Sequence, residues 1–305
     1  MKIAAVIVTY NRLEDLKRAL SSYSKQLLKP EYLIVVNNAS TDGTKKYLQE
    51  WETVLEGYKK IVITMDENTG GSGGFYRGMQ EVLKTDCEWC WIADDDAFVE
   101  EKTFSALAQF VKKNQPKVDA CAALCSSVIN HGVPDLWHRR KVERGIFKFK
   151  QTSSQISDYD KEYFEVNMFT YVGACINMKA LKKAGLPIKD LFIYYDDLEH
   201  SYRLSKSGKI YCVPSAKVIH DSREGEETVL IDWRYYFKIK NSLYFYKKHA
   251  KDMFAYFALK RIVKNYFYWI MRKYTVKEEV EWQAFKDACK EKLGISEKYQ
   301  IGWKG

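Results

Sequence analysis

The chain has 305 residues, 46% of them apolar, and a formal net charge of +9. That length can bury a large core in one or two domains, and no apolar run approaches the roughly 18 residues of a transmembrane helix. The first residues run straight into a strand-like pattern without the layout of a signal peptide, which predicts a cytoplasmic protein.

The basic excess lies at the C-terminal end. Residues 232–305 hold 17 basic and 8 acidic residues, while the preceding part is balanced. The seven cysteines lie mostly in apolar surroundings, which predicts reduced thiols in a reducing compartment. Cys87 and Cys90 form a CxxC pair, but no second pair follows, and the residues between them belong to a strand pattern. This argues against zinc or redox chemistry.

In the N-terminal part, short β-rich runs alternate with helical runs. Near-continuous apolar strands separated by helices predict a parallel sheet covered on both faces, with ligands received at the carboxyl ends of the strands. We therefore expect an α/β fold with a Rossmann-like nucleotide-binding half. The expected strands are 3–8, 33–36, 61–63 and 89–93, and the expected helices are 13–23, 44–55 and 75–83.

The later part of the chain is less regular. Residues 126–165 lose periodicity and are interpreted as an irregular insertion. The basic and aromatic composition of the C-terminal end indicates a helical region over 226–305 that follows a domain over 1–225. The other expected elements are helices at 102–112 and 197–205 and strands at 118–124, 171–178, 191–195 and near 210 and 218.

Polar segments follow four of the predicted strands. They begin at Thr9, Asn37, Asn68 and Asp94. Because the carboxyl ends of parallel strands meet at one edge of a sheet, these segments are expected to line one crevice. The segment after Asn37 also supplies capping residues for a following helix, which is its purely structural interpretation.

The run Asp94-Asp95-Asp96 comes directly after a buried strand. Three carboxylates there are costly unless a positive charge offsets them, and a divalent cation that holds a phosphorylated ligand would do so. His220, at the end of another predicted strand, could complete the metal shell. A solvated acidic turn that caps the helix near Glu100 is the alternative.

Two further segments are candidates for chemistry. The glycine-rich segment from Asn68 to Gly78 opens a helix, so its backbone could approach an anion and Arg77 could reach a phosphate. A flexible surface loop is the alternative, and the P-loop spacing is missing. Asp196-Asp197 stand at a strand-to-helix junction, where a carboxylate could remove a proton from a hydroxyl, or simply cap the helix.

Together, these segments resemble inverting family 2 glycosyltransferases of GT-A fold. The matching segments begin at Val8, Val36, Asp94 and Asp196, and they follow the family's order over about residues 3–222. The resemblance implies a nucleotide-diphosphate sugar donor and a glycan or lipid-linked glycan acceptor. It implies Mn²⁺ or Mg²⁺ held by Asp94, Asp96 and His220, and Asp197 as catalytic base. Asn37 departs from the aspartate of many relatives, near the nucleotide base.

The resemblance also assigns the donor site. The auxiliary or acceptor-side candidates are Asp196, Glu199 and His200. The donor-binding candidates are Thr9, Tyr10, Asn11, Arg12, Asn37, Asn38, Asn68, Gly70, Gly71, Ser72, Gly73, Gly74, Arg77, Asp94 and Asp95.

Within the family, the glycine-rich segment looks like the galactofuranosyltransferase branch that extends cell-surface glycans. UDP-galactofuranose is therefore the expected donor, with dTDP-rhamnose as the competitor. Two other functions stay open, a noncatalytic nucleotide-sugar binding or scaffold subunit and a nucleotidyltransferase. The nucleotidyltransferase is disfavoured because the segment after Thr9 lacks a phosphate-gripping loop.

The C-terminal region has a distinctive composition. Residues 232–274 hold 15 aromatic and 11 basic residues against two acidic ones. Helices of this composition suit an anionic membrane surface, which predicts peripheral attachment to the inner face of the plasma membrane. Packing onto the catalytic core and a homo-oligomer interface are the alternatives. No nucleic-acid reading motif accompanies the positive charge, so no nucleic-acid partner is expected.

Overall fold

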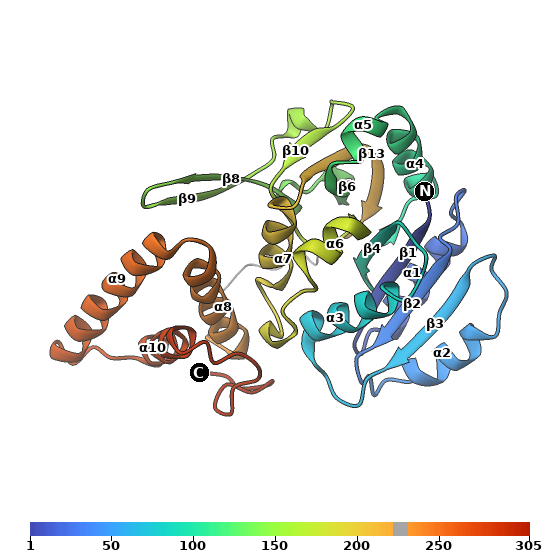
Figure 1. Cartoon of the computed structure of the whole chain (residues 1–305). Coiled ribbons are helices and arrows are strands. Elements are labelled where there is room, and N and C mark those ends of the chain that lie inside the picture. The colour runs from blue at the N-terminus through green and yellow to red at the C-terminus, as the bar shows by residue number, and fades with distance from the viewer. Residues whose placement is uncertain (222–230) are drawn as a thin grey trace.

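A computed structural model describes residues 1–221 and 231–305. The predicted boundary between residues 225 and 226 lies outside the described residues. Figure 1 shows a large α/β body built on a central sheet and, beside it, a group of C-terminal helices.

The N-terminal strands form the predicted parallel sheet. They are β1 (Ile3–Thr9), β2 (Tyr32–Asn37), β3 (Lys59–Thr64) and β4 (Trp89–Asp94). Strand β1 lies between β2 and β4 and pairs with both in parallel, so that Val8 is opposite Val36 on one side and Asp94 on the other. The register therefore brings the polar segments that follow these strands to one edge.

The sheet continues on the other side of β4. Strand β12 (Ala174–Asn177) runs antiparallel to both β4 and β6 (Cys121–Asn130), which makes the sheet mixed. The strand order is β10-β13-β6-β12-β4-β1-β2-β3, with β13 (Lys209–Ile219) and β10 (Phe164–Val166) at the far side. Two short strands join its margin, β5 (Phe98–Val99) and β7 (Val133–Pro134).

Helices cover both faces of the sheet because successive strand residues point to opposite sides. In β1, Ala5 and Ile7 face one apolar cluster, while Val6 and Val8 face the other. The first cluster is covered by α1 (Leu13–Ser24), α2 (Thr44–Glu52) and α4 (Thr103–Lys113). The second is covered by α3 (Gly70–Val82) and α6 (Met178–Ala184), and the short helix α5 (Gln115–Val118) follows α4.

Helix α3 differs from the prediction in where it begins. The helix was expected over 75–83, after a glycine loop, but it begins at Gly70 and includes the glycines. A Cβ on Gly74 would come within 2.4 Å of Val8 Cγ1, and one on Gly78 within 2.3 Å of Val6 Cγ1. These two glycines therefore allow α3 to pack closely against β1.

Two predictions about the middle of the chain are wrong. The insertion at 126–165 is not irregular, because β8 (Arg139–Gly145) and β9 (Lys148–Ser153) form an antiparallel hairpin that β11 (Met168–Phe169) joins. No strand forms over 191–195, where a 3₁₀ turn (Lys189–Leu191) leads through left-handed residues to α7 (Asp196–Ser205). Further 3₁₀ turns span Leu136–His138 and Ile156–Asp158.

The C-terminal region contains α8 (Trp233–His249), α9 (Lys251–Ile270) and α10 (Val276–Cys289). Asp232 caps α8 by accepting hydrogen bonds from the Arg234 and Tyr235 amides. Trp233 and Phe237 of α8 form an apolar cluster with Phe192 of the α/β body. In the described part of the chain, no helix has both the length and the apolar character needed to cross a bilayer.

Candidate active site

A cavity of about 680 Å³ opens at the carboxyl ends of β1 and β4. Its wall joins segments that are far apart in the sequence. The predicted site residues that line it are Thr9, Tyr10, Arg12, Asn38, Asn68, Gly70, Gly71, Asp94, Asp95, Asp96, Asp196, Asp197 and His220. Both acidic segments therefore face a single space.

The aspartate run is partly neutralised by Arg12. The guanidinium of Arg12 pairs with Asp96, and its Nη1 lies 3.5 Å from Asp95 Oδ1. Burial, together with the charges of Asp96 and Asp95, raises the pKa of Asp94 well above its usual value. Burial likewise raises the pKa of Asp95 to about 7, against the stabilising effects of Thr9 and Arg12. The single positive charge of Arg12 therefore does not balance the three carboxylates of the run.

His220, just after β13, reaches the same carboxylates. Its Nε2 lies 3.4 Å from Asp96 Oδ1, and its ring packs edge-on against His138 with 5.5 Å between centroids. Although burial opposes it, the contacts with His220 and Arg12 lower the pKa of Asp96 to about 2. Asp96 is therefore the most firmly ionised carboxylate of the run.

The side-chain oxygen and nitrogen atoms of the aspartate run and His220 suit a divalent cation. Carboxylate oxygens of Asp94 and Asp96 with the imidazole of His220 match the ligand preferences of Mn²⁺, and the carboxylates match those of Mg²⁺. Over residues 1–221 and 231–305, no three acidic, histidine or cysteine side chains already stand in a metal-binding arrangement. Arg12 pairs with one oxygen of Asp96, and His220 Nε2 lies 3.4 Å from the other.

Asn38 organises the other side of the cavity. Its Nδ2 donates to Asn68 Oδ1 at 3.0 Å and to the Gly70 carbonyl at 2.9 Å, while its Oδ1 accepts from the Thr69 amide at 3.0 Å. Gly70 has a φ of +70°, and a Cβ there would lie 2.0 Å from the Phe192 carbonyl oxygen. Only glycine allows α3 to begin at this point.

Several predicted donor residues do not line the cavity. Asn11 Oδ1 accepts from the Thr41 amide at 2.7 Å, and Asn37 Oδ1 accepts from the Ser40 amide at 2.9 Å, so both amides brace the loop after β2. Arg77 pairs with Glu81 at 3.0 Å on the flank of α3. Gly73 and Gly74 are buried at packing contacts of α3. The structure thus places these residues where they support the site.

The segment before Asp196 has an unusual backbone. Phe192, Tyr194 and Tyr195 all have positive φ, between 63° and 67°, a conformation that costs free energy for residues other than glycine. Asn241 of α8 holds this segment. Its buried Nδ2 lies within 2.8–3.0 Å of the carbonyls of Leu191, Ile193 and Tyr194.

Helix α3 fixes the same segment from the opposite side. The Ser72 hydroxyl donates to the Ile188 carbonyl at 2.7 Å, and its amide donates to the Phe192 carbonyl at 3.2 Å. Ser72 therefore positions the segment before α7, although the sequence predicted it as a donor contact. The strained turn directs both Asp196 and Asp197 into the cavity.

Asp197 has the environment of a base. Burial raises its pKa, although the Leu198 amide donates to its Oδ1 at 2.6 Å and Arg140 favours its charged form. Burial and the charge of Asp197 raise the pKa of Asp196 as well. Because Asp197 is only partly buried and lines the cavity, an incoming hydroxyl has access to it. A raised pKa brings a carboxylate closer to the range useful for proton abstraction.

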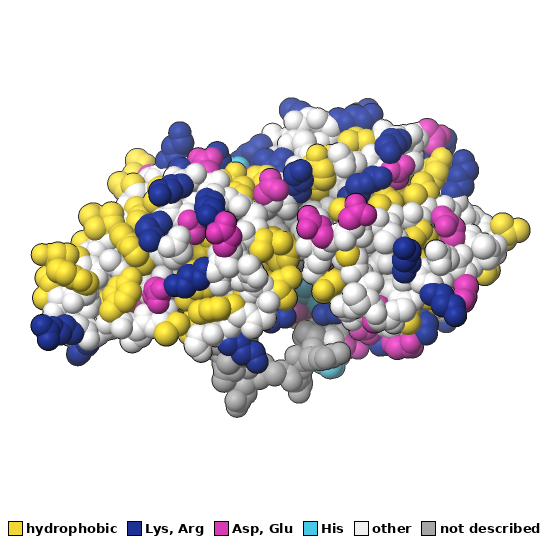
Figure 2. Space-filling view, turned by 90° about the horizontal axis from the view of Figure 1, so that it is seen from below, with side chains coloured by type: hydrophobic (Ala, Val, Ile, Leu, Met, Phe, Trp, Pro, Cys, Tyr) yellow, Lys and Arg dark blue, Asp and Glu magenta, His cyan; other side chains and the backbone are white. Residues whose placement is uncertain are grey.

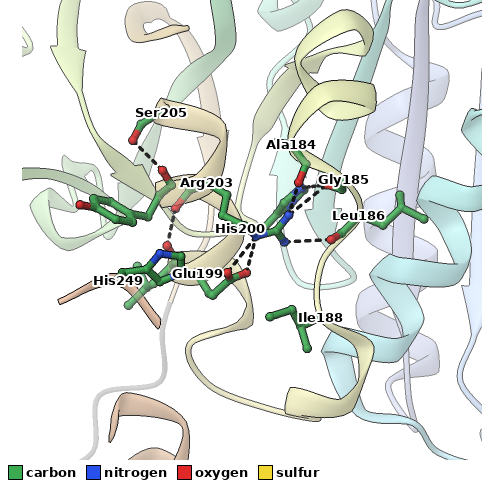
Figure 3. A network of polar contacts seen from close by, with 12 residues as sticks. Ala184, Gly185, Leu186, Ile188, Glu199, His200, Arg203, Ser205 and His249 are labelled. Atoms are coloured by element: carbon green, nitrogen blue, oxygen red, sulfur yellow. Dashed lines mark hydrogen bonds and ion pairs between the residues drawn. The ribbon is translucent and has the colours of Figure 1, made fainter. Parts of the chain in front are cut away.

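Glu199 and His200 lie outside the cavity and stabilise α7. Figure 3 shows Arg203 directed at the backbone of residues 184–186, with Glu199 between Arg203 and His249. Glu199 Oε1 lies 2.8 Å from Arg203 Nε and 3.0 Å from His249 Nε2. Burial lowers the pKa of His200 to about 3, so its ring is neutral at ordinary pH.

The structure adds residues to the site that the sequence did not predict. Tyr171, whose hydroxyl lies 2.7 Å from His200 Nδ1, enters from the segment before β12. Trp233 and Arg234 begin α8, whose basic aromatic pattern was assigned to membrane binding. The unpredicted lining residues are Val8, Phe75, His138, Thr170, Tyr171, Val172, Phe192, Ile193, Trp233, Arg234 and Ile301.

Comparison with known proteins identifies the family. The sequence model described as Glycosyl transferase family 2 matches residues 4–185, more than half of the chain. The chain belongs to glycosyl transferase family 2. The match includes the aspartate run, while Asp197 and His220 lie beyond its end. The family is one of glycosyltransferases.

The chain is also similar to a curated member of the family. The chain is 27% identical over 209 residues to galactofuranosyltransferase GlfT1 of Mycobacterium tuberculosis strain H37Rv. This alignment covers 68% of the chain and 65% of GlfT1, so the chain spans just under two thirds of that relative's length.

Solved structures show the same GT-A fold. The structure of GalNAc-T7 with UDP, GalNAc and Mn²⁺ superposes with a TM-score of 0.62 at 17% identity, covering 95% of this chain and 56% of that chain. The S. aureus TarS 1–349 complex with UDP superposes with a TM-score of 0.57 at 16% identity, covering 96% and 82%.

Proposed function

We propose that this protein transfers galactofuranose from UDP-galactofuranose to a glycan or lipid-linked glycan in cell-surface polysaccharide synthesis. The observation that carries the proposal is the single cavity that joins the aspartate run and His220 to Asp197. The galactofuranosyltransferase relatives support the sugar, and UDP in the similar structures supports the nucleotide. Residues 1–225 would form the catalytic domain, and 226–305 the helical region.

The proposed reaction uses residues on both sides of the cavity. Asp94, Asp96 and His220 would hold Mn²⁺ or Mg²⁺, which when bound offsets the charge of the donor's diphosphate. Thr9, Tyr10 and Asn38 line the part of the cavity proposed for the nucleoside. Asp197 accepts the proton of the acceptor hydroxyl. The hydroxyl oxygen bonds to the anomeric carbon as the bond from that carbon to the diphosphate breaks, with inversion.

We further propose that the C-terminal region attaches the enzyme to the inner face of the plasma membrane. A lipid-linked acceptor would be presented there. Trp233 and Arg234 of this region line the catalytic cavity, so the region that would meet the membrane also borders the proposed reaction site.

A panel of nucleotide sugars tests the proposed donor. UDP-galactofuranose with Mn²⁺ should raise the melting temperature more than dTDP-rhamnose, and transfer to a soluble galactofuranosyl acceptor should follow. Preferential stabilisation by dTDP-rhamnose would support the rhamnosyltransferase instead. Binding of a nucleotide sugar without turnover on any acceptor would indicate a noncatalytic binding subunit.

A further inference from the structure

Helix α9 carries an unusual surface. Every residue of the helix is at least partly exposed. Eight large apolar side chains on it are between 49% and 68% exposed: Tyr256, Leu259, Ile262, Val263, Tyr266, Phe267, Trp269 and Ile270. At 100° per residue they fall within an arc of about 160° on one side of the helix. We refer to these eight side chains as the α9 surface.

The opposite side of α9 is anchored to the protein. Phe254, Phe257 and Ala258 pack against the cluster that contains Leu243 and Phe285 of α8 and α10. Arg261 pairs with Glu281 of α10, and Lys264 Nζ lies 3.1 Å from the same carboxylate. The α9 surface is therefore presented outward by a helix whose other side is fixed.

The β8–β9 hairpin extends this surface. Asp252 lies seven residues before Leu259, on the same side of α9. Its carboxylate binds Arg144 of β8 and accepts from the Phe147 amide at 2.7 Å. The contact holds the hairpin tip beside the first turn of α9, where Ile146 is 89% exposed and Phe147 is 65% exposed.

Basic residues border the apolar side chains. Lys260 shares a groove of about 520 Å³ with Tyr256, Leu259 and Val263. Four other basic residues near the helix ends are exposed: Lys251, Arg272, Lys273 and Lys277. Figure 2 shows hydrophobic side chains gathered at the left end of the molecule, where α9 lies, with basic side chains beside them. The composition combines apolar area with positive charge.

We propose that the α9 surface and the hairpin tip dock on an anionic phospholipid bilayer, with α9 parallel to the membrane plane. Its aromatic side chains suit the interfacial region, and the bordering cations suit acidic headgroups. A second copy fits less well, because the cations that border the surface, Lys260 among them, would face a partner surface with the same positive border and not acidic groups. The proposal deepens, and rests on, the membrane attachment proposed above.

Vesicle flotation of the full chain tests the docking. Wild-type protein should float with vesicles of phosphatidylcholine and phosphatidylglycerol, bind pure phosphatidylcholine more weakly, and detach partly when NaCl rises from about 0.05 M to about 0.5 M. The double substitution Leu259→Ser with Val263→Ser should weaken binding at least about tenfold. The matched control is Val54→Ser with Leu55→Ser, at residues that are 54% and 98% exposed near the end of α2. The control should bind like the wild type.

Three results would overturn the docking proposal. The first is a wild type that does not bind anionic vesicles. The second is equal binding by both double variants. The third is a dimer in sedimentation that only the α9 variant dissociates, together with no vesicle binding. Transfer to a soluble acceptor separates the two proposals, since the α9 variant should keep this activity. Vesicle binding without any sugar transfer would leave the docking in place and remove the proposed enzyme function.

Discussion

The two acidic segments of the cavity are held in different ways. Asp94–Asp96 continue a central strand of the sheet, and Arg12 and His220 contact their carboxylates. Asp196 and Asp197 begin a helix after a turn with left-handed residues, which Ser72 and Asn241 hold through backbone carbonyls.

This difference matches two kinds of chemistry. A segment with several carboxylates suits the binding of a cation, because the cation brings the positive charge that the carboxylates need. A segment whose backbone is held rigidly, with an accessible, partly buried carboxylate, suits a proton acceptor, which must be placed accurately beside the incoming hydroxyl. Substitutions in each segment can separate these two roles.

Replacing the proposed base should have the largest effect. Asp197→Asn keeps the shape of the side chain but removes the proton acceptor, so kcat should fall about 10²–10⁴-fold while metal-dependent donor binding persists. Transfer assays and thermal shifts with UDP-sugar measure both quantities. Asp190→Asn, at an exposed position six residues upstream from Asp196, serves as the matched control and should leave kcat unchanged. Wild-type rates in Asp197→Asn would refute the assignment.

Changing the proposed metal ligand should affect donor binding first. Asp96→Asn should abolish the Mn²⁺-dependent rise in melting temperature with UDP and lower the transfer rate at least about 10²-fold. Chelation of metal from the wild type should have the same effect, and added Mn²⁺ should reverse it. Asp66→Asn, at an exposed position after β3, is the control. An unchanged thermal response in Asp96→Asn would exclude Asp96 as a ligand.

A substitution of Asn241 tests whether the segment before Asp196 must be held in place for Asp197 to act. Asn241→Leu removes the amide donor that the three carbonyls share, so the free energy of unfolding should fall by about 1–3 kcal/mol and kcat by about tenfold. Donor binding through the aspartate run should be retained. Asn265→Leu, the same substitution on α9, should preserve kcat. Equal losses of donor affinity and kcat in Asn241→Leu would show that the whole cavity has collapsed.

The pH dependence should show the smallest effect. Because burial raises the pKa of Asp197, kcat should begin to fall on acidification at a pH above the ordinary aspartate value of about 4. The value of kcat falls on acidification because the protonated carboxyl of Asp197 cannot accept the hydroxyl proton. The residual activity of Asp197→Asn should lack this acidic limb. If the acidic limb of the kcat profile persists in Asp197→Asn, it reports the protonation of a group other than Asp197.

The sequence predicted the sheet half of the fold and most cavity residues. Apolar strands such as Ile3–Thr9 are long, continuous and bounded by polar segments, so their positions and parallel pairing follow from local pattern. The same argument brought Thr9, Asn38 and Asp94 to one edge. These residues need only the end of their own strand to be placed correctly.

The remaining features depend on tertiary contacts. The left-handed residues before Asp196 are tyrosines and a phenylalanine, whose sequence gives no turn signal, and Asn241 stabilises them from a helix about 50 residues later. Trp233 and Ile301 reach the cavity only because the C-terminal region packs on Phe192. The first glycines of α3, over 70–74, were placed before the predicted helix because local propensity ignores the close approach of the helix to β1.

The close packing of α3 also sets the depth of the cavity. Gly78 touches the sheet about two helical turns from Gly70, at the cavity wall. An added methyl group at Gly78 would press on Val6 and tilt or lift the rigid helix. Gly70 would then shift together with Asn38 and Phe192, to which it is packed. The floor on which a nucleoside would rest is thus determined by a contact in the apolar core.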